Sequence, residues 1–191
     1  MVSIMLQSRF SGFDLARPIT AIVYVDGQEF ETVLAAMTEA MARSGMRLAG
    51  LIHCTPPGTA IRKCNLHVQD LATGELHGIS DDRGPHVRGC MLDTDRLLRA
   101  AEAARLSLTA DVDLLVVCKF GKTEVAGGGL CALMADALDL SIPVLIGVPA
   151  VNLDAFRAFS GDLACEVDVS EFGRAHTLPV SHERGGDGTA H

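Results

Sequence analysis

The chain has 191 residues, of which 48% are hydrophobic and 21% charged, and its formal net charge at pH 7 is -8. An acidic chain with only 4% aromatic residues lacks the basic face and stacking side chains of a general nucleic-acid binder, so this class of function is excluded. No apolar run approaches the roughly 20 residues of a membrane span. The six cysteines form no C-x-x-C pair. This pattern favours reduced thiols and predicts a cytoplasmic location.

A single α/β domain is the simplest organisation for a chain of this length. We expect the domain to span residues 18–173, after a loose lead-in at residues 1–17 and before a flexible tail at residues 174–191. The tail ends in ERGGDGTAH, and this composition cannot bury enough apolar surface to become ordered.

Short apolar runs alternate with amphipathic stretches along the chain. Runs that are apolar throughout are typical of strands buried on both faces of a parallel sheet. We predict strands at 19–25, 46–52, 112–118, 142–148 and 163–167, and helices at 28–44, 93–108, 130–140 and 153–159. This alternation predicts helices on both faces of a mainly parallel sheet. We expect the strand at 112–118 to be central and to lie between those at 19–25 and 142–148.

The middle of the chain has a different pattern. Apolar and polar residues alternate over residues 61–80, interrupted by Thr73 and Gly74. This pattern predicts a β-hairpin insertion with one solvated face. The following stretch, 81–89, is rich in glycine, proline and charge and is predicted to be a loop.

Cations and glycines follow the apolar run at 112–118 directly. Open α/β sheets bind ligands at the carboxyl ends of their strands, and backbone N–H groups and cations together suit an oxyanion. The candidate ligand-binding residues are Lys119, Lys122, Glu124, Gly127, Gly128, Gly129, Arg83, Arg88 and Cys90. The alternative is that the lysines are solvated loop charges and that the glycines only allow a tight connection.

Other chemistries fit the sequence less well. The turn after the first predicted strand lacks the G-x-x-x-x-G-K-[ST] phosphate loop and carries Asp26, Glu29 and Glu31 in its place, so it would repel a triphosphate. The sequence supports a Ser/His/Asp or Cys/His hydrolase still less, because no G-x-S-x-G elbow is present and no Cys/His pair is fixed by local spacing.

A zinc site was weighed on the histidines and cysteines of the first half of the chain. Its candidate ligands are His53, Cys54, Cys64, His67, His86 and Cys90. These residues lie on unlike predicted elements and form no paired knuckle. We therefore expect no metal ligands and no cofactor.

Two distinctive runs, TGELHGISDDRGPHVRGCMLDTDRL and DLLVVCKFGKTEVAGGGL, are followed by IPVLIGV. Together they resemble an uncharacterised bacterial family associated with molybdenum-transport genes and distantly related to the thermophile-type P-loop nucleoside triphosphatases. The resemblance covers most of residues 19–170. It implies a three-layer, P-loop-NTPase-like α/β domain with a mainly parallel sheet and the hairpin insertion.

The same resemblance implies that the site is degenerate. In the triphosphatases the comparable strand ends in D-E-I-G-x-M-E, whose first carboxylates serve magnesium and the attacking water. Cys118 stands at the position of that aspartate and Lys119 at that of the first glutamate, while Phe120, Gly121 and Glu124 keep the motif. In the uncharacterised family itself an asparagine is expected at position 118.

The sequence therefore predicts non-hydrolytic binding of an anionic small molecule, a nucleotide or an oxyanion such as molybdate, and predicts no catalytic residue. Lysines and arginines would supply charge, the three glycines a close backbone approach, Glu124 orientation and Cys90 part of the wall. The alternatives are a nucleoside triphosphatase with an altered site and a protein-protein adaptor. Neither nucleic-acid binding nor membrane insertion is expected, and a homo-oligomer is left open.

Overall fold

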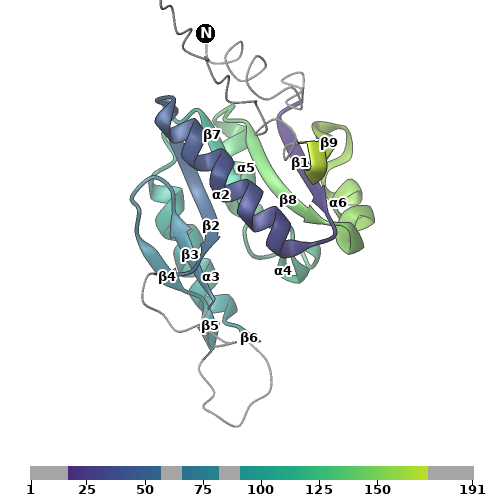
Figure 1. The fold of residues 1–191 in the computed structure, drawn as a ribbon, viewed down its shortest axis with the longest axis horizontal. Coiled ribbons are helices and arrows are strands. Elements are labelled where there is room, and N and C mark those ends of the chain that lie inside the picture. The colour runs from purple at the N-terminus through teal and green to yellow at the C-terminus, as the bar shows by residue number, and fades with distance from the viewer. Residues whose placement is uncertain (1–16, 57–65, 82–90, 172–191) are drawn as a thin grey trace, which may run out of the picture.

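A seven-stranded sheet forms the centre of the domain in the computed structural model, which describes residues 17–56, 66–81 and 91–171 (Figure 1). The sheet has the strand order β4-β3-β2-β7-β8-β1-β9. Neighbouring strands from β2 to β9 in this order are parallel. The strands of this parallel part are β1 (Ile19–Tyr24), β2 (Leu48–Cys54), β7 (Leu114–Val117), β8 (Val144–Pro149) and β9 (Ala164–Asp168).

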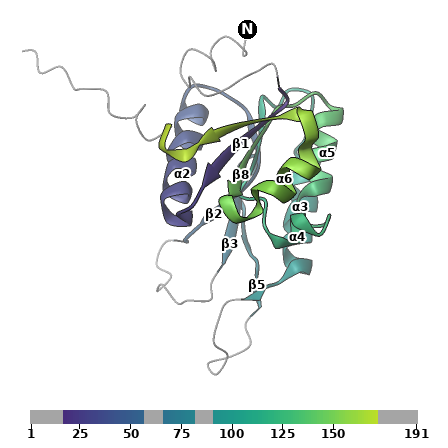
Figure 2. The same cartoon turned by 90° about the vertical axis from the view of Figure 1, so that its right-hand side faces the viewer.

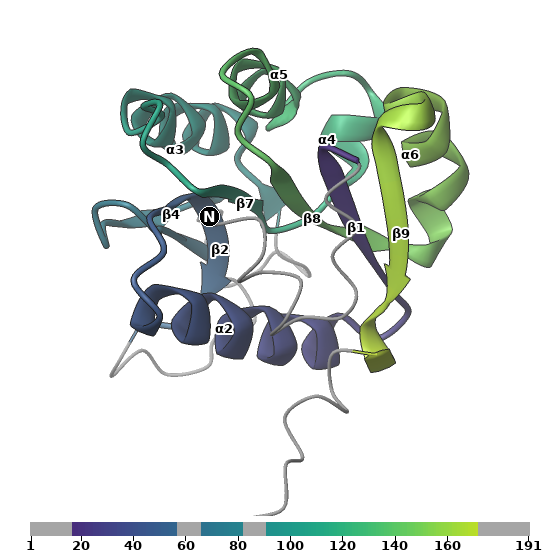
Figure 3. The ribbon, with the colours of Figure 1, turned by 90° about the horizontal axis from the view of Figure 1, so that it is seen from above.

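Helices cover both faces of the sheet and give the domain three layers (Figures 2 and 3). Of the α-helices in the described residues, one lies on one face, and four lie on the other, of which one is short. The lone helix is α2 (Gly27–Arg43), and those opposite are α3 (Thr94–Leu106), α4 (Lys122–Val125), α5 (Cys131–Asp139) and α6 (Leu153–Ser160). The predicted fold class, a three-layer α/β domain with a mainly parallel sheet, is confirmed.

The core is divided by the sheet into two apolar clusters. Side chains alternate between the faces of each strand, so Leu114 and Val116 join the cluster that contains Phe30 and Met37 of α2. The neighbouring residues of β7 contribute to the other cluster, with α3, α5 and α6. All four residues of β7 are buried, and this explains why the strand is apolar throughout.

The predicted neighbours of the central strand are partly wrong. β7 is central and parallel, and it lies beside β8 as expected, but its second neighbour is β2. β1 lies instead between β8 and β9. The β1-α2-β2 crossover passes over two strands, and hydrophobic periodicity does not encode how many strands a crossover spans.

The hairpin insertion is confirmed at the β2 edge of the sheet. β3 (His67–Asp70) pairs antiparallel with β2 and with β4 (Leu76–Gly78). Asp70 is buried, and its carboxylate accepts the backbone N–H of Ala72 at 2.8 Å, while Gly74 takes φ 76° in the predicted turn. The edge therefore turns back on itself with its polar groups paired.

A second small sheet borders the predicted loop. β5 (Ser80–Asp81) pairs with β6 (Met91–Leu92), and these two short strands were not predicted. Most of the predicted loop, together with the predicted lead-in and tail, lies outside the described residues. Among the helices that the structure describes, none is both long and apolar enough to cross a bilayer.

Candidate ligand site

A cavity of about 510 Å³ lies at the carboxyl-end edge of the sheet. Its walls come from the ends of β1, β2, β7 and β8, from the turn that contains α4, and from residues near β5, β6 and α3. The lining residues are Tyr24, His53, Leu66, Ile79, Leu92, Thr94, Leu97, Cys118, Lys119, Gly121, Lys122, Thr123, Glu124, Leu130, Pro149, Val151 and Asn152. This is where open α/β sheets bind their ligands, and the volume is in the range of small-molecule sites.

Phe120 attaches the turn after β7 to the core. This side chain is buried and contacts Phe156 edge-to-face, with ring centroids 5.3 Å apart. Its backbone N–H donates to the carbonyl of Gly147 at 2.7 Å, and its carbonyl accepts the side-chain amide of Asn152 at 2.8 Å. The sequence places Asn152 at the start of α6, but its side chain makes no capping bond there and ties two strand ends together instead.

Glu124 organises the same turn from inside. Its side chain is 4% exposed, and its two carboxylate oxygens accept the backbone N–H groups of Gly121 at 2.8 Å and Leu130 at 3.0 Å. The carboxylate therefore replaces backbone partners that the short α4 cannot supply. Glu124 lines the cavity, and both of its oxygens are already engaged within the turn.

The three glycines follow α4, and Gly129 lies directly against this carboxylate. Gly127 and Gly129 have φ values of 78° and 59°. A Cβ at Gly129 would lie 2.0 Å from Oε1 of Glu124, so only glycine fits there. The backbone N–H groups of Gly127 and Gly128 donate to carbonyls of Glu124 and Thr123.

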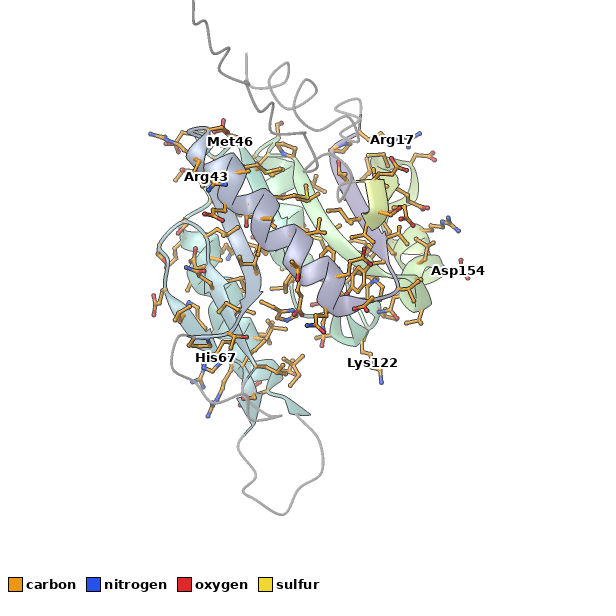
Figure 4. All side chains as sticks on the ribbon, in the orientation of Figure 1. Arg17, Arg43, Met46, His67, Lys122 and Asp154 are labelled. Carbon is orange, nitrogen blue, oxygen red and sulfur yellow. The ribbon has the colours of Figure 1, made fainter. Side chains whose placement is uncertain are left out.

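The structure brings Lys119, Lys122 and Glu124 together at the cavity. Figure 4 shows Lys122 at this edge of the domain, opposite the edge that carries Arg43 and Met46. Gly127, Gly128 and Gly129 are not among the lining residues. The other predicted ligand-binding residues, Arg83, Arg88 and Cys90, lie outside the described part of the chain.

A series of polar side chains borders the cavity where β2 and β7 end. Nδ1 of His53 lies 3.0 Å from Oε1 of Glu31 on α2. Leu51 of β2 lies opposite Val117 of β7, so His53 and Cys118 stand on neighbouring strand ends, and both line the cavity. Cys118 is 4% exposed and borders the cavity, and Tyr24 stacks on Phe30 beside this group with ring centroids 4.2 Å apart. The site thus holds a cysteine, a histidine and a carboxylate next to one another in space.

The charges of this series are coupled. Burial lowers the pKa of His53, but the negative charge of Cys118 and hydrogen bonding to Cys118 and Glu31 outweigh it and raise the pKa to about 10. The hydrogen bond from His53 lowers the pKa of Glu31. Burial, followed by the negative charges of Cys118 and Glu31, raises the pKa of Tyr24 to about 12. Opposite shifts at His53 and Glu31 indicate an imidazolium-carboxylate pair.

The turn after β1 is closed to anions by its own side chain. The carboxylate of Asp26 accepts the N–H groups of Gln28 at 2.8 Å and Glu29 at 3.2 Å, and so it caps the first turn of α2. A phosphate would compete with this carboxylate for the same donors. The predicted absence of a phosphate loop at this turn is consistent with this geometry.

Three of the residues of the candidate zinc site are described by the structure, and two of these, Cys54 and His67, lie opposite each other on β2 and β3. Within residues 17–56, 66–81 and 91–171, no group of three or more His, Cys, Asp or Glu side chains is arranged to hold a metal ion. His53 pairs with Glu31 as described, and Cys54 is its neighbour on β2, where successive side chains point to opposite faces. Cys64, His86 and Cys90 lie outside these residues.

The series of Glu31, His53 and Cys118 is the feature that sequence reasoning missed. Cys118 ends an apolar run and packs in the core cluster with residues of α3, α5 and α6, so the sequence pattern around it does not mark it as a site residue. The usable signal is positional, since His53 lies near the carboxyl end of β2 and Cys118 directly follows β7. Parallel strands bring their carboxyl ends to one edge, so polar residues at the ends of two such strands meet there.

The model of the family described as "Protein of unknown function (DUF2478)" matches residues 19–173, which include the sheet and every element of the site. The chain belongs to this family. The match ends close to the last described residue and spans the whole core. The DUF2478 assignment thus agrees with the family resemblance of the two sequence runs.

Two individual relatives resemble this DUF2478 chain. The first is "Molybdenum import ATP-binding protein ModC 2" of Bradyrhizobium diazoefficiens, 32% identical over 157 residues, which are 80% of this chain and 18% of the relative. The chain therefore spans about a fifth of the length of the curated relative. The second is the crystal structure of THEP1 from Aquifex aeolicus, with 15% identity and a TM-score of 0.46, covering 79% of this chain and 87% of that one.

Proposed function

We propose that the protein binds an anionic small molecule in the cavity at the carboxyl ends of β1, β2, β7 and β8 without hydrolysing it. One observation carries the proposal: Lys119 and Lys122 line a cavity of about 510 Å³ whose remaining wall is largely apolar. Cations beside apolar walls suit a ligand with a charged group and an organic body.

The size of the cavity favours a nucleotide over a bare oxyanion. Leu66, Ile79 and Leu97 line one wall, and a base or comparable ring would cover apolar surface that a tetrahedral oxyanion would leave in contact with water. Molybdate could use the lysines alone. We therefore rank a nucleotide first and a molybdate-like oxyanion second.

Two features support binding without hydrolysis. Of the cavity-lining residues in the described part of the chain, Glu124 is the one carboxylate, and both of its oxygens accept backbone N–H groups. The turn after β1 carries Asp26 rather than the lysine of a phosphate loop. Magnesium-dependent phosphoryl transfer requires a phosphate cradle and a free metal-binding acid. The alternative, a triphosphatase with an altered site, would need to supply both from elsewhere.

The connection to molybdenum rests on the name of one relative, a molybdenum import ATP-binding protein that carries a similar segment as 18% of its length. We propose that the DUF2478 protein takes part in molybdenum uptake or handling in the cytoplasm. A protein-protein adaptor remains the competing hypothesis, because a segment that accompanies an ATP-binding protein can also act by contact alone.

A thermal-shift panel tests the proposal. The purified protein is screened with ATP, ADP, GTP, molybdate, tungstate, sulfate and phosphate. We expect at least one nucleotide or oxyanion to stabilise the protein, by up to ~2.7 kcal/mol at 100 times its dissociation constant. The Lys119→Ala/Lys122→Ala double variant should lose this stabilisation.

The matched control removes the same charge from the opposite edge of the domain. Arg43 and Arg47 form exposed ion pairs with Glu39 and Asp111, so Arg43→Ala/Arg47→Ala should keep the ligand-induced shift. A panel in which no compound stabilises the parent, or equal shifts in both double variants, would contradict the anion site. Phosphate release from ATP or GTP that exceeds a heat-inactivated control and stops with EDTA would favour the triphosphatase alternative.

A further inference from the structure

The series formed by Cys118, His53 and Glu31 has the arrangement of an activated nucleophile. Such a site needs a nucleophilic atom, an imidazole beside it, and a third group that orients the imidazole. Nδ1 of His53 lies 3.0 Å from Oε1 of Glu31, and His53 and Cys118 line the same cavity from the neighbouring ends of β2 and β7. The sulfur borders the cavity of about 510 Å³, so a small molecule in the cavity can reach it.

We propose that Cys118 is a nucleophilic thiol, activated by His53, that forms a covalent bond with an electrophilic carbon of an anionic molecule held in the cavity. His53 is the imidazolium that favours the thiolate, and Glu31 is a positioning residue that acts through His53. The negative charge of the electrophile rests on the proposed function, because it is Lys119 and Lys122 that favour an anion. The reactivity of the thiol does not depend on it.

The step balances without an oxidant or reductant. Because His53 already carries its proton as an imidazolium, Cys118 reacts as the thiolate beside it, and a sulfur lone pair attacks the carbon. The sulfur-carbon bond forms as the bond from that carbon to its leaving group breaks, and the leaving group departs with the electron pair. The imidazolium holds the proton and can transfer it to the leaving group. Glu31 stabilises the imidazolium during this step.

The other described cysteines lack this arrangement. Cys131 donates to the carbonyl of Glu124 at 3.6 Å, and burial and the negative charge of Glu124 raise the pKa of its thiol. Burial also raises the pKa of Cys54. Cys165 donates to the hydroxyl of Thr20 at 3.5 Å. All three are more exposed than Cys118. If accessibility decided reactivity, these three cysteines would react before Cys118; if activation by a neighbouring histidine decides it, Cys118 reacts first.

Alkylation of the unmodified chain under limiting iodoacetamide at pH 6 separates the two orders. Site occupancies over time are measured by peptide mass spectrometry. We expect Cys118 to react at least about tenfold faster than Cys54, Cys131 and Cys165, because a neighbouring imidazolium favours the thiolate at a pH where free thiols are protonated. Cys118 reacting no faster than these three cysteines would overturn the proposal.

Two variants assign the roles of the neighbours. His53→Gln should slow the alkylation of Cys118 at least about tenfold at pH 6 and much less at pH 9.5, where thiols ionise without help. Glu31→Gln, on the exposed part of α2, should move the midpoint of the pH profile upward by a smaller amount and keep the maximal rate. Its control is Glu29→Gln on the same helix, which should leave the profile unchanged. Should His53→Gln fail to fold, the Glu31→Gln profile decides, and an unshifted midpoint contradicts the series.

The charge of the reagent tests the anionic part separately. Iodoacetate is negatively charged and iodoacetamide is neutral, and both alkylate the same thiol. The rate with iodoacetate divided by the rate with iodoacetamide therefore reports electrostatic selection alone. We expect this ratio to be higher at Cys118 than at Cys165, and Lys119→Ala/Lys122→Ala to lower it several-fold. A fast thiol with equal ratios in parent and variant would overturn the anionic electrophile and the proposed anion site, while the nucleophile would stand on its pH profile.

Discussion

Two strand-to-helix turns lie at the same edge of the sheet and treat charge in opposite ways. After β1, the Asp26 carboxylate occupies the N–H groups at the start of α2. After β7, the Glu124 carboxylate is turned inward onto backbone N–H groups, and Lys119 and Lys122 line the cavity. The position of the acid therefore decides whether a turn can hold an anion. Asp26 at the start of α2 occupies the N–H groups that an anion would need. Glu124 is bound within its own turn, so Lys119 and Lys122 are the charged groups that face a ligand there.

The largest effect is expected where glycine makes room for the buried carboxylate. Gly129→Ala would place a Cβ 2.0 Å from Oε1 of Glu124, at a φ of 59°, so it should destabilise the fold by about 3 kcal/mol through backbone strain and a displaced carboxylate. Gly128→Ala is the control, because its Cβ would meet Thr123 at an ordinary 3.5 Å and should change stability by less than about 0.5 kcal/mol. Urea denaturation measures both, and equal losses would show that Glu124 does not organise the turn.

A second effect comes from the His53 pair and depends on pH. The pKa of His53 is about 10 in the folded protein, above its ordinary 6.5. The folded state therefore holds this proton more tightly, and the resulting stability is fully present below pH 6.5 and lost as the pH rises toward 10. The pKa of Glu31 is lowered, so its contribution is lost only as the pH falls below 4.5.

The variant His53→Gln should therefore cost more stability at pH 6 than at pH 9.5. We expect a difference of about 2 kcal/mol, which allows for screening of the half-exposed Glu31. Urea denaturation of parent and variant at the two pH values measures it. A cost that is the same at both values would mean that His53 is not charged in the folded state.

Removing the cap of α2 should have a smaller effect. Asp26→Ala leaves the N–H groups of Gln28 and Glu29 without their carboxylate and should cost about 1 kcal/mol. Thermal denaturation measures the loss. The exposed Glu29→Ala change on the same turn should cost less, and a larger loss there would shift the capping role away from Asp26.

The smallest effect should come from the lysines in the ligand-free protein. Lys119 lowers the pKa of His53, so removing this cation relieves repulsion with the imidazolium. Lys119→Ala/Lys122→Ala should change stability by less than about 0.5 kcal/mol, in the stabilising direction. A clear destabilisation in urea would indicate that these lysines hold the fold together rather than bind a ligand.

Much of the fold was predictable because local patterns encode it. The apolar run that became β7 and the periodic stretch that became α2 are visible in the sequence, and so is Asp93, which caps α3 by accepting the N–H of Arg96 at 3.0 Å. Strand order was not predictable, because periodicity identifies a strand and not its neighbours. The turn after β7 was predicted as a loop, and the four residues of α4 are too few for a helical period to appear.

The candidate site was predictable only in part, for a related reason. Lys119 and Lys122 follow the central strand directly, so the carboxyl-end rule places them at the binding edge. Glu31, His53 and Cys118 lie on three elements that are far apart in the chain, and their contact depends on the strand order that the sequence does not reveal. β2 lies beside β7, and this neighbour relation brings His53 to Cys118.

We expect an anion to bind at the turn after β7 and not at the turn after β1. Isothermal titration, with the compound that shifts the melting temperature most, tests it directly in the parent, Lys119→Ala/Lys122→Ala and Asp26→Asn. We predict that the lysine variant loses at least about tenfold in affinity, or 1.4 kcal/mol, and that Asp26→Asn binds as the parent does. Tighter binding by Asp26→Asn, together with unchanged binding by the lysine variant, would place the anion at the start of α2 and contradict the account.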